Sequence, residues 1–348
     1  MSILEVKNLR VSFHAYAGRV QAVRGVSFSV DSGETLAIVG ESGCGKSVTV
    51  QTVMKLTPTP PAFIEEGQIL YNGRDITGCS EKEMQQLRGG EFSMIFQDPM
   101  TSLNPTMRVG RQINESILKH TSLSSKEATE KTMEMMRLVG IPKPEMNMLR
   151  YPHTYSGGMR QRIMIAMGMS TNPKILFADE PTTALDVTTQ SQILDLMNSL
   201  KKQFNMAMVL ITHNLGVVAR MADKVAVMYA GKIVETGTAR EVFYEPKHPY
   251  TWGLLNSMPD INGTDGSREL AAIPGTPPDL YAPPAGCAFA ARCPYAMGAC
   301  LKAQPEETSL SGTHKASCHL LDPRAPKVPA YEAKRHAVEG KQQSLGGM

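Results

Sequence analysis

Short apolar segments separated by polar turns predict an alternation of strands and helices along most of this chain. Hydrophobic and polar residues alternate between residues 3 and 32 and again at Gln68-Ile69-Leu70-Tyr71, which predicts an antiparallel β layer. From Lys174 to Val218, apolar runs alternate with segments that can be helical, a pattern typical of a parallel sheet. Asp223 to Thr236 predicts a final hairpin that turns at Ala230-Gly231.

Two further stretches differ from this pattern. Residues 100–170 are rich in methionine at helical spacing, and Glu127 to Gly140 ends at a glycine stop signal, so a helical subdomain is expected there. Proline becomes frequent after Pro246. We expect a first domain over 1–255, a Cys-containing C-terminal domain over 256–322, and a polar, disordered tail over 323–348.

Charge and hydropathy narrow the function classes. The formal net charge of the 348 residues is +3, too small to indicate a nucleic-acid groove, so no nucleic-acid partner is expected. No apolar run approaches the roughly 20 residues that a spanning helix needs, and no signal-like segment opens the chain. We therefore expect a cytosolic chain whose membrane role, if it has one, comes through a partner.

The most informative motif lies between an apolar run, Leu36 to Val39, and a segment that can be helical, Val48 to Leu56. It matches the phosphate-binding loop G-x-x-x-x-G-K-[ST], although a glycine-rich turn can match by chance. Backbone N–H groups and the helix N-terminus would face the phosphates, the lysine would reach the β- and γ-phosphates, and the serine hydroxyl would bind Mg²⁺. The candidate ATP-binding residues here are Gly40, Ser42, Gly43, Gly45, Lys46 and Ser47.

Later motifs support a nucleotide site. An apolar strand ends in Asp179-Glu180, which would place Asp179 on the Mg²⁺ shell and Glu180 toward the attacking water. A further apolar run delivers His213. An acidic strand end or a lone histidine is common by itself, but their order after the phosphate loop favours a catalytic reading.

At this point the chain resembles the ATP-binding subunits of ATP-binding-cassette (ABC) transporters over roughly residues 3–255. The resemblance implies an α/β fold with a P-loop NTPase core, a flanking antiparallel layer and a helical subdomain. It also implies roles for specific residues: a glutamine loop at Gln97, a signature loop at Ser156-Gly157-Gly158, a D-loop at Ala184-Leu185-Asp186 and a switch histidine at His213. Phe13 would be the platform for the adenine ring, and Tyr16 is the alternative residue for that role.

The family mechanism follows from the resemblance. The signature loop of one subunit contacts ATP held by another, so one chain alone cannot complete a site. Glu180 would polarise water, His213 would contact the γ-phosphate, and Gln97 would sense Mg²⁺ and water. Two departures leave the phosphate ligands intact: Met159 stands where glutamine is common, and Asn214 stands where aspartate is usual.

The C-terminal region carries four of the six cysteines, at Cys287, Cys293, Cys300 and Cys318. A cytosolic location makes structural disulfides improbable and favours metal. Zinc ligands are usually paired at C-x₂₋₄-C, whereas these cysteines are well separated, which favours a [4Fe–4S] cluster over zinc or free thiols.

The same region resembles the C-terminal extension of oligopeptide and dipeptide import ATPases, in which four such cysteines can hold a [4Fe–4S] cluster. The motifs are His248-Pro249-Tyr250-Thr251, Ile273-Pro274-Gly275 and Arg292-Cys293-Pro294. The resemblance implies a peptide-import ATPase at the cytoplasmic membrane face. Its partners would be two permease subunits, a related second ATPase and, indirectly, an extracellular binding protein.

Two other functions remain open: a soluble ABC ATPase in translation, repair or cofactor assembly, and a redox-sensing ATPase regulated by its cluster. Heterodimer and homodimer also remain open, with a heterodimer expected. We expect the permease to dock on residues 97–105, with Met100 and Leu103 in the contact.

Overall fold

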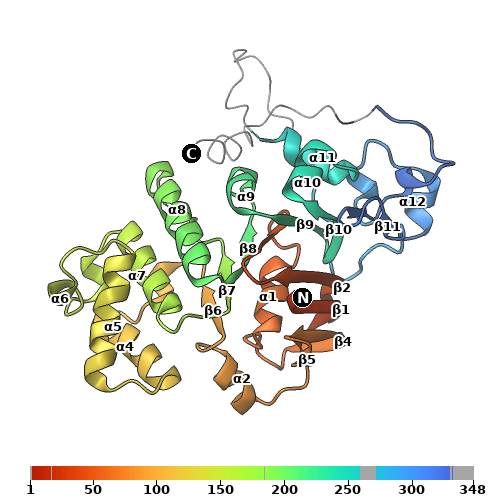
Figure 1. The fold of residues 1–348 in the computed structure, drawn as a ribbon. Coiled ribbons are helices and arrows are strands. Elements are labelled where there is room, and N and C mark those ends of the chain that lie inside the picture. The colour runs from red at the N-terminus through yellow and green to blue at the C-terminus, as the bar shows by residue number, and fades with distance from the viewer. Residues whose placement is uncertain (1, 17, 184, 259–271, 330, 332–348) are drawn as a thin grey trace, which may run out of the picture.

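A computed structural model describes residues 2–16, 18–183, 185–258, 272–329 and 331. Two sheets form its centre, and helices gather around them (Figure 1). No helix in these ranges is long and apolar enough to cross a membrane.

The smaller sheet is the expected antiparallel layer. Its strand order is β2-β1-β4-β5, and every neighbouring pair is antiparallel. Leu4, Val6, Leu9 and Val11 of its central strand are buried against the main sheet, because bulges keep apolar residues on the inner face. The strands are β1 (Ser2–Ala15), β2 (Gly18–Asp31), β4 (Ala62–Tyr71) and β5 (Arg74–Asp75).

The main sheet has the order β11-β12-β10-β9-β3-β8-β7-β6, and its strands from β9 to β6 are parallel. Every residue of β3, β7 and β8 is buried, as expected for parallel strands covered on both faces. The predicted parallel sheet and final hairpin are both confirmed. The strands are β3 (Thr35–Val39), β6 (Phe92–Ile95), β7 (Ile175–Asp179), β8 (Ala207–Thr212), β9 (Lys224–Tyr229), β10 (Lys232–Thr238), β11 (Thr308–Ser309) and β12 (Lys315–Ala316).

Helices near the sheets carry the functional loops. Helix α1 (Lys46–Val53) follows β3, α8 (Val187–Phe204) follows β7, and α9 (Leu215–Met221) follows β8. The others outside the helical subdomain are α2 (Glu81–Leu87), α10 (Ala239–Tyr244), α11 (Pro249–Asn256), α12 (Gly298–Lys302) and the 3₁₀ turns η2 (Ala290–Arg292) and η3 (His319–Leu321).

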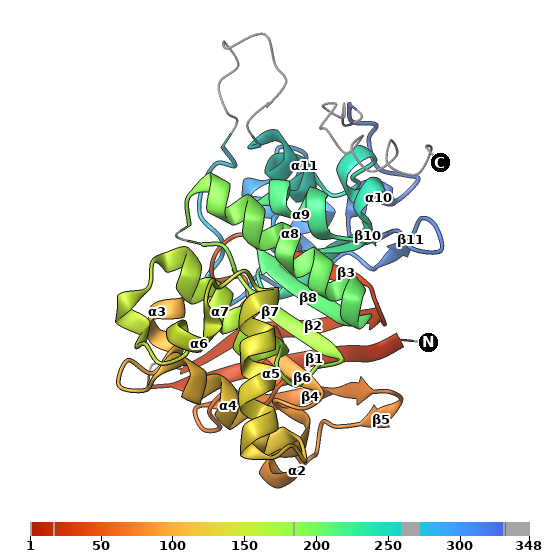
Figure 2. The same cartoon turned by 60° about the vertical axis from the view of Figure 1, so that its left-hand side comes forward.

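The helical subdomain lies beyond β6, at the opposite end of the molecule from β10 and β11 (Figures 1 and 2). A capping box between Ser124 and Glu127 starts its longest helix at Ser125, two residues before the predicted start. Met135, Met136, Met164 and Met169 are buried, so most methionines at helical spacing fill the core here. The helices are α3 (Pro99–Ser102), α4 (Val109–His120), α5 (Ser125–Leu138), α6 (Pro144–Asn147), η1 (Pro152–Thr154) and α7 (Gly157–Met169).

The C-terminal segment extends the main sheet. Glu235 and Thr236 of β10 pair with Ala316 and Lys315 of β12, so two short strands continue the core sheet at its edge. The domain division at residue 255 stays a prediction. The sequence predicts disorder over residues 323–348. Of these, 330 and 332–348 lie outside the described residues, and 323–329 contain no helix or strand.

Candidate functional site

The predicted phosphate loop connects the central strand β3 to α1. Backbone carbonyls crowd it from outside: a Cβ at Gly40 would collide with the carbonyl of Met228, and one at Gly45 with that of Ala22. Only glycine therefore fits both positions. Lys46 Nζ donates to the carbonyl oxygens of Gly40 (2.8 Å) and Glu41 (2.9 Å), so the loop curls around the ammonium group.

Ser42 and Gly43 form the exposed tip of this loop, whereas Lys46 is buried beneath it. Ser47, at the start of α1, donates from Oγ to Asp179 Oδ1 at 3.0 Å. Ser47 lies on α1 and Asp179 at the end of β7, and hard oxygen donors of this kind suit Mg²⁺. Burial raises the pKa of Asp179, an effect that the Ser47 hydrogen bond opposes.

Glu180 is the centre of a hydrogen-bond cluster. Its Oε2 accepts from Gln97 Nε2 (3.0 Å) and Thr183 Oγ1 (2.9 Å), and its Oε1 lies 2.9 Å from His213 Nδ1. Burial raises the pKa of Glu180, but hydrogen bonds from His213 and Thr183 more than offset it and hold the pKa below its ordinary value. The carboxylate is thus kept charged by a cluster that includes all three predicted catalytic residues. Thr183 was not predicted, because no motif marks it.

The backbone of Glu180 is also unusual. Its φ is +46°, in the left-handed region that is costly for a residue with a side chain. The turn after β7 holds this conformation, since the Glu180 N–H donates to the Ile211 carbonyl at 2.9 Å. The turn directs the carboxylate toward Gln97 and His213, which come from different loops.

The predicted signature loop begins α7. Ser156 is the N-cap, and its Oγ accepts from the Met159 N–H. Gly158 faces Thr189 of α8 so closely that a Cβ would require this side chain to shift. Helix α7 lies among the helices beyond β6, whereas α1 follows β3 and packs beside β1 and β2, so these two candidate ATP-binding loops are apart in one chain (Figure 1).

The predicted D-loop and the loop after His213 each end in a residue that caps the following helix. Asp186 of the predicted D-loop caps α8 by accepting from the Thr189 N–H at 2.9 Å; Ala184 lies outside the described residues. Asn214 caps α9 by accepting from the Gly216 N–H at 2.9 Å. Asparagine and aspartate cap equally well, which explains why Asn214 can stand where aspartate is usual.

The two candidate adenine platforms differ in their surroundings. Phe13 lies on β1, opposite Val20 of β2, and packs partly against the core. Tyr16 is fully exposed in the turn between these strands. These contacts do not test which residue stacks on the adenine ring, and Phe13 stays the predicted adenine platform.

A contact that sequence reasoning missed joins the C-terminal segment to the phosphate loop. Arg292 Nη1 and Nη2 donate to Glu41 Oε2 and Oε1 at 2.6 and 2.9 Å. The hydroxyl of Tyr250 accepts from the Glu41 N–H at 2.9 Å. The second residue of the loop is therefore held through both its side chain and its backbone. The nearest sequence signal was the Arg292-Cys293-Pro294 motif.

The four C-terminal cysteines are free thiols. Burial, with smaller contributions from charge on Cys287, Cys293 and Cys300, raises the pKa of Cys318 to about 12, so the four groups lie near one another. Among the described residues, however, no three His, Cys, Asp or Glu side chains are arranged to hold a metal ion. As they lie, the thiols are not a ligand set, and the predicted iron–sulfur cluster and its zinc alternative gain no support from this geometry.

The predicted docking residues separate into two kinds. Met100 is 61% exposed, but Leu103 is 1% exposed and belongs to the core of the helical subdomain. The expectation that Leu103 contacts a partner is therefore wrong for a simple reason: its side chain faces inward. Met146, Leu149 and Tyr151 are also exposed, and the last two line a pocket of about 430 Å³ with residues of α4.

Comparisons with known proteins assign the chain to a family. The family model described as "ABC transporter" matches residues 23–183, and "Oligopeptide/dipeptide transporter, C-terminal region" matches residues 234–300. A dimeric ATP-binding cassette bound to ADP and Pi, solved in a post-hydrolysis state, superposes with a TM-score of 0.61 at 23% identity. It covers 68% of this chain and 99% of its own, and it supports the fold alone.

Curated relatives are much closer in sequence. The oligopeptide transport ATP-binding protein OppD of Bacillus subtilis is 58% identical over 95% of this chain and 92% of its own length. The dipeptide transport ATP-binding protein DppD of the same organism is 55% identical over 93% and 96%. OppD of Salmonella typhimurium is 51% identical over 90% and 92%. The chain belongs to the ABC transporter family, as an ATP-hydrolysing cassette of the oligopeptide and dipeptide transport group.

Proposed function

We propose that this chain is the ATP-hydrolysing subunit of a membrane transporter that imports oligopeptides or dipeptides. The observation that carries the proposal is the cluster around Glu180, which joins Gln97, Thr183 and His213 beside the Ser47–Asp179 pair. The names of the relatives supply the peptide substrate, since they are oligopeptide and dipeptide transport proteins along nearly their whole length.

The chemistry assigned to each residue follows from its contacts. Lys46 would exchange its two loop carbonyls for the β- and γ-phosphates of ATP, which it can reach from beneath the loop. Ser47 and Asp179 would hold Mg²⁺, which when bound neutralises charge on the phosphates. Glu180, kept ionised by its hydrogen bonds, would orient the attacking water, and His213 would donate to the γ-phosphate.

Gln97 would couple this chemistry to a partner. It contacts Glu180 directly, and two residues later α3 begins, capped by Asp98 through the Met100 N–H at 2.7 Å. A shift of α3 would therefore move the glutamine that touches Glu180. We assign the permease contact to the exposed apolar side chains near α3 and α6: Met100, Met146, Leu149 and Tyr151.

A second ATPase subunit would complete each site. Ser156, Gly157 and Gly158 cap a helix that lies apart from α1 of the same chain (Figure 1). Presented by a partner, this helix N-terminus would face the γ-phosphate with its backbone N–H groups. We propose a heterodimer with a related ATPase, two permeases, and an extracellular binding protein engaged through them, so that the chain is peripheral to the cytoplasmic membrane face.

Purification from membranes tests this function against a soluble ABC ATPase. The tagged chain, extracted in mild detergent, should copurify with two polytopic membrane proteins and a second cassette protein. The purified complex should hydrolyse ATP faster when a peptide-loaded binding protein is added. Recovery of the chain from the soluble fraction bound to ribosomes or DNA-repair proteins would contradict the proposal.

For the C-terminal segment we propose a [4Fe–4S] cluster on Cys287, Cys293, Cys300 and Cys318, with zinc as the alternative. The support is chemical: four free thiols in one segment whose charges interact. Since their side chains do not form a ligand set as they lie, binding would have to draw them together. Anaerobically purified protein should carry about four iron and about four sulfide ions per chain. Zinc alone, or no metal, would end the cluster proposal.

A further inference from the structure

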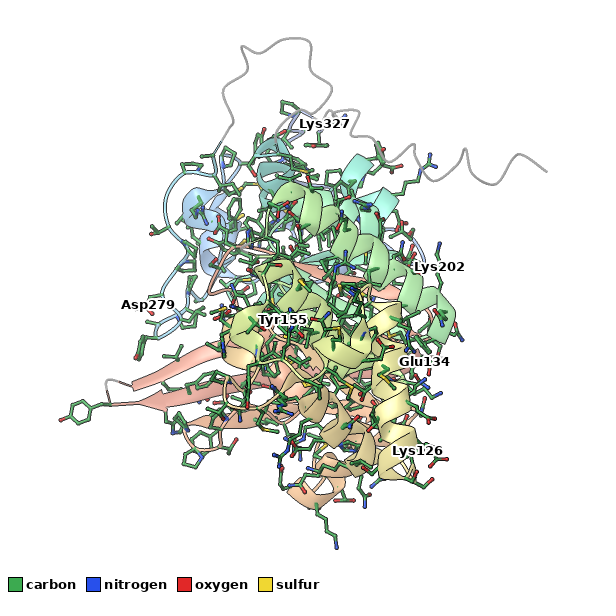
Figure 3. All side chains as sticks on the ribbon, turned by 90° about the vertical axis from the view of Figure 1, so that its left-hand side faces the viewer. Lys126, Glu134, Tyr155, Lys202, Asp279 and Lys327 are labelled. Atoms are coloured by element: carbon green, nitrogen blue, oxygen red, sulfur yellow. The ribbon has the colours of Figure 1, made fainter. Side chains whose placement is uncertain are left out.

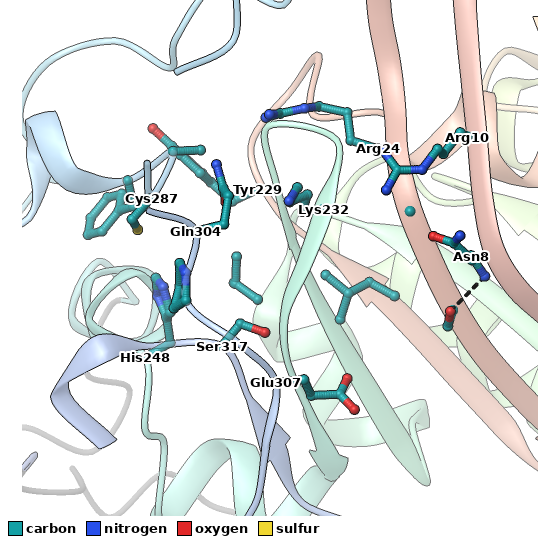
Figure 4. A pocket seen from close by; sticks show the side chains of 17 residues that line it. Asn8, Arg10, Arg24, Tyr229, Lys232, His248, Cys287, Gln304, Glu307 and Ser317 are labelled. Atoms are coloured by element: carbon teal, nitrogen blue, oxygen red, sulfur yellow. Dashed lines mark hydrogen bonds between the residues drawn. The ribbon is translucent and has the colours of Figure 1, made fainter. Parts of the chain in front are cut away.

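A small cavity lies between the antiparallel layer, the β9–β10 hairpin and the C-terminal segment (Figure 4). Its volume is about 210 Å³. None of residues 40–47 lines it, so it is separate from the nucleotide site described above.

Positive charge dominates the lining. Arg10 and Arg24 face the cavity from β1 and β2, and Lys232 faces it from the start of β10 (Figure 4). Glu307 is the acidic residue among the lining side chains, and its Oε1 is already paired with Lys315 Nζ at 2.8 Å. The lining thus holds three cationic side chains and one carboxylate, Glu307, whose charge is already balanced by Lys315.

Two of the cations have no acidic partner. Arg10 Nε lies 2.9 Å from Glu66 Oε2, whereas neither Arg24 nor Lys232 forms an ion pair with another described residue. Arg24 is 8% exposed, and its Nη1 donates to the Ala230 carbonyl over a long 3.3 Å. A cation buried without a counter-charge is costly, so this arrangement favours an anion in the cavity.

The pKa shifts agree with this reading of the geometry. Burial lowers the pKa of Arg24, with a further contribution from Arg10. Burial also lowers the pKa of Lys232, with contributions from Arg24 and Arg10 that negative charge on Cys287 opposes. Each cation is therefore disfavoured by its surroundings, and a bound anion would reverse the sign of that effect.

A neutral donor completes the lining. His248 is buried, and burial lowers its pKa to about 4, so the imidazole is uncharged at neutral pH. Its Nδ1 accepts from the Tyr250 N–H at 3.0 Å, which leaves the ring proton on Nε2. The cavity thus combines a guanidinium fork, an ammonium group and an imidazole N–H, the donors that bind oxyanions.

We propose that this cavity binds a small multivalent oxyanion of the phosphate class, held mainly by Arg24 and Lys232. The guanidinium of Arg24 suits two oxygens of one tetrahedral group, and Lys232 supplies a point charge to a third. The volume of about 210 Å³ lies below the roughly 300–1,000 Å³ of sites that enclose larger organic ligands, which favours an inorganic anion over a nucleotide.

The test must separate this cavity from the phosphate loop, which also attracts phosphate. Hydrogen bonds link the two sites: Arg24 N–H donates to Gly231 O (2.7 Å), Gly231 N–H donates to Cys44 O (3.0 Å), and Arg292 donates to both Tyr229 of the cavity and Glu41 of the loop. Binding is therefore measured on the full chain carrying Lys46→Ala, which weakens the phosphate loop itself. Anion binding to the Lys46→Ala chain does not depend on ATP hydrolysis. A negative result would therefore contradict the anion site without contradicting the proposed transport function.

Isothermal titration with inorganic pyrophosphate, and with inorganic phosphate in parallel, provides the measurement. We expect one anion to bind per chain, with affinity at least tenfold weaker after Lys232→Gln and reduced by added salt. Lys202→Gln removes the same charge from the outer face of α8 and should leave the affinity unchanged (Figure 3). Equal affinity in the two variants, or no binding of either anion, would overturn the proposal.

Melting temperature gives an independent check that does not rely on measured affinities. Without anion, Lys232→Gln should melt at or above the temperature of its parent, because it removes repulsion from Arg24 and Arg10. With pyrophosphate, the parent should gain more stability than the variant and the order should reverse. A variant that melts lower than its parent without anion, and gains as much from pyrophosphate, would count against the site.

Discussion

The guanidinium of Arg292 forms a two-pronged ion pair with Glu41, with Nη1–Oε2 and Nη2–Oε1 distances of 2.6 and 2.9 Å. The two residues are 251 positions apart in the chain. Glu41 is the second residue of the phosphate loop, and Tyr250 holds its N–H from the same side. The C-terminal segment therefore supports the predicted phosphate loop through Glu41.

Breaking this ion pair should destabilise the protein. The Arg292 side chain is 5% exposed and that of Glu41 is 27% exposed, so Arg292→Gln leaves a half-buried carboxylate without its cation. We expect a loss of about 2–3 kcal/mol in the free energy of unfolding, somewhat below the cost for a fully buried pair. Urea denaturation measures it. Adding Glu41→Gln should recover part of the loss, whereas strictly additive effects would show that the two residues are not coupled.

Glu180 and Lys46 should differ in how they affect the reaction. Glu180→Gln keeps the shape of the side chain but removes the charge that orients water, so ATP should bind normally while turnover falls by at least 10²-fold. Lys46→Ala should instead weaken ATP binding itself. Equilibrium binding and phosphate release, measured on both variants, separate the two effects. Turnover close to normal in the Glu180→Gln protein would show that another group orients the water.

His248 should make stability depend on pH. Burial lowers its pKa from 6.5 to about 4, so the unfolded chain takes up a proton more readily than the folded one. The contribution is complete above the unfolded pKa and is lost as pH falls toward the folded pKa. We expect a loss of about 2 kcal/mol between pH 7 and pH 5.

The variant His248→Asn serves as the matched control for this prediction. Asparagine can still cap α11 at the Tyr250 N–H, as the His248 ring does, but it does not titrate. Urea unfolding at the two pH values should show a smaller pH dependence in the variant. The same drop in both proteins would assign the pH dependence to other groups.

Met100 and Leu103 should behave differently despite their proximity. Met100→Arg places a charge on an exposed apolar surface and should uncouple transport while leaving the basal ATPase activity of the purified complex within about twofold, since surface changes are usually mild. Leu103→Ala removes a buried side chain and should cost about 2–5 kcal/mol of stability. Transport assays and urea unfolding are measured on both variants. Normal transport by Met100→Arg, or normal stability of Leu103→Ala, would contradict the prediction.

Much of the site was predictable because its parts are local in sequence. The predicted phosphate loop at 40–47 lies between strand β3 and the start of helix α1, and the acidic and histidine motifs come at the ends of buried strands that are themselves continuous apolar runs. The sequence order of these units leaves few ways to assemble a parallel sheet. Their placement at one sheet edge follows from that topology.

The remaining features depend on tertiary packing. The burial of Leu103 beside exposed Met100 is set by how α3 meets α7, which the spacing of two apolar residues does not decide. The pairing of β12 with the core sheet involves two residues on each strand, too few for a periodic signal. The arrangement of the four cysteines likewise depends on loops, whose conformation no local pattern specifies.

Peptide uptake into proteoliposomes tests the central claim most directly. The full transporter, purified with this chain and reconstituted, should accumulate a labelled peptide only when ATP and the binding protein are supplied. The same complex carrying Glu180→Gln should assemble and bind ATP but transport at background level. Uptake by the Glu180→Gln complex at the normal rate would contradict the account, because transport would then not depend on hydrolysis at this site.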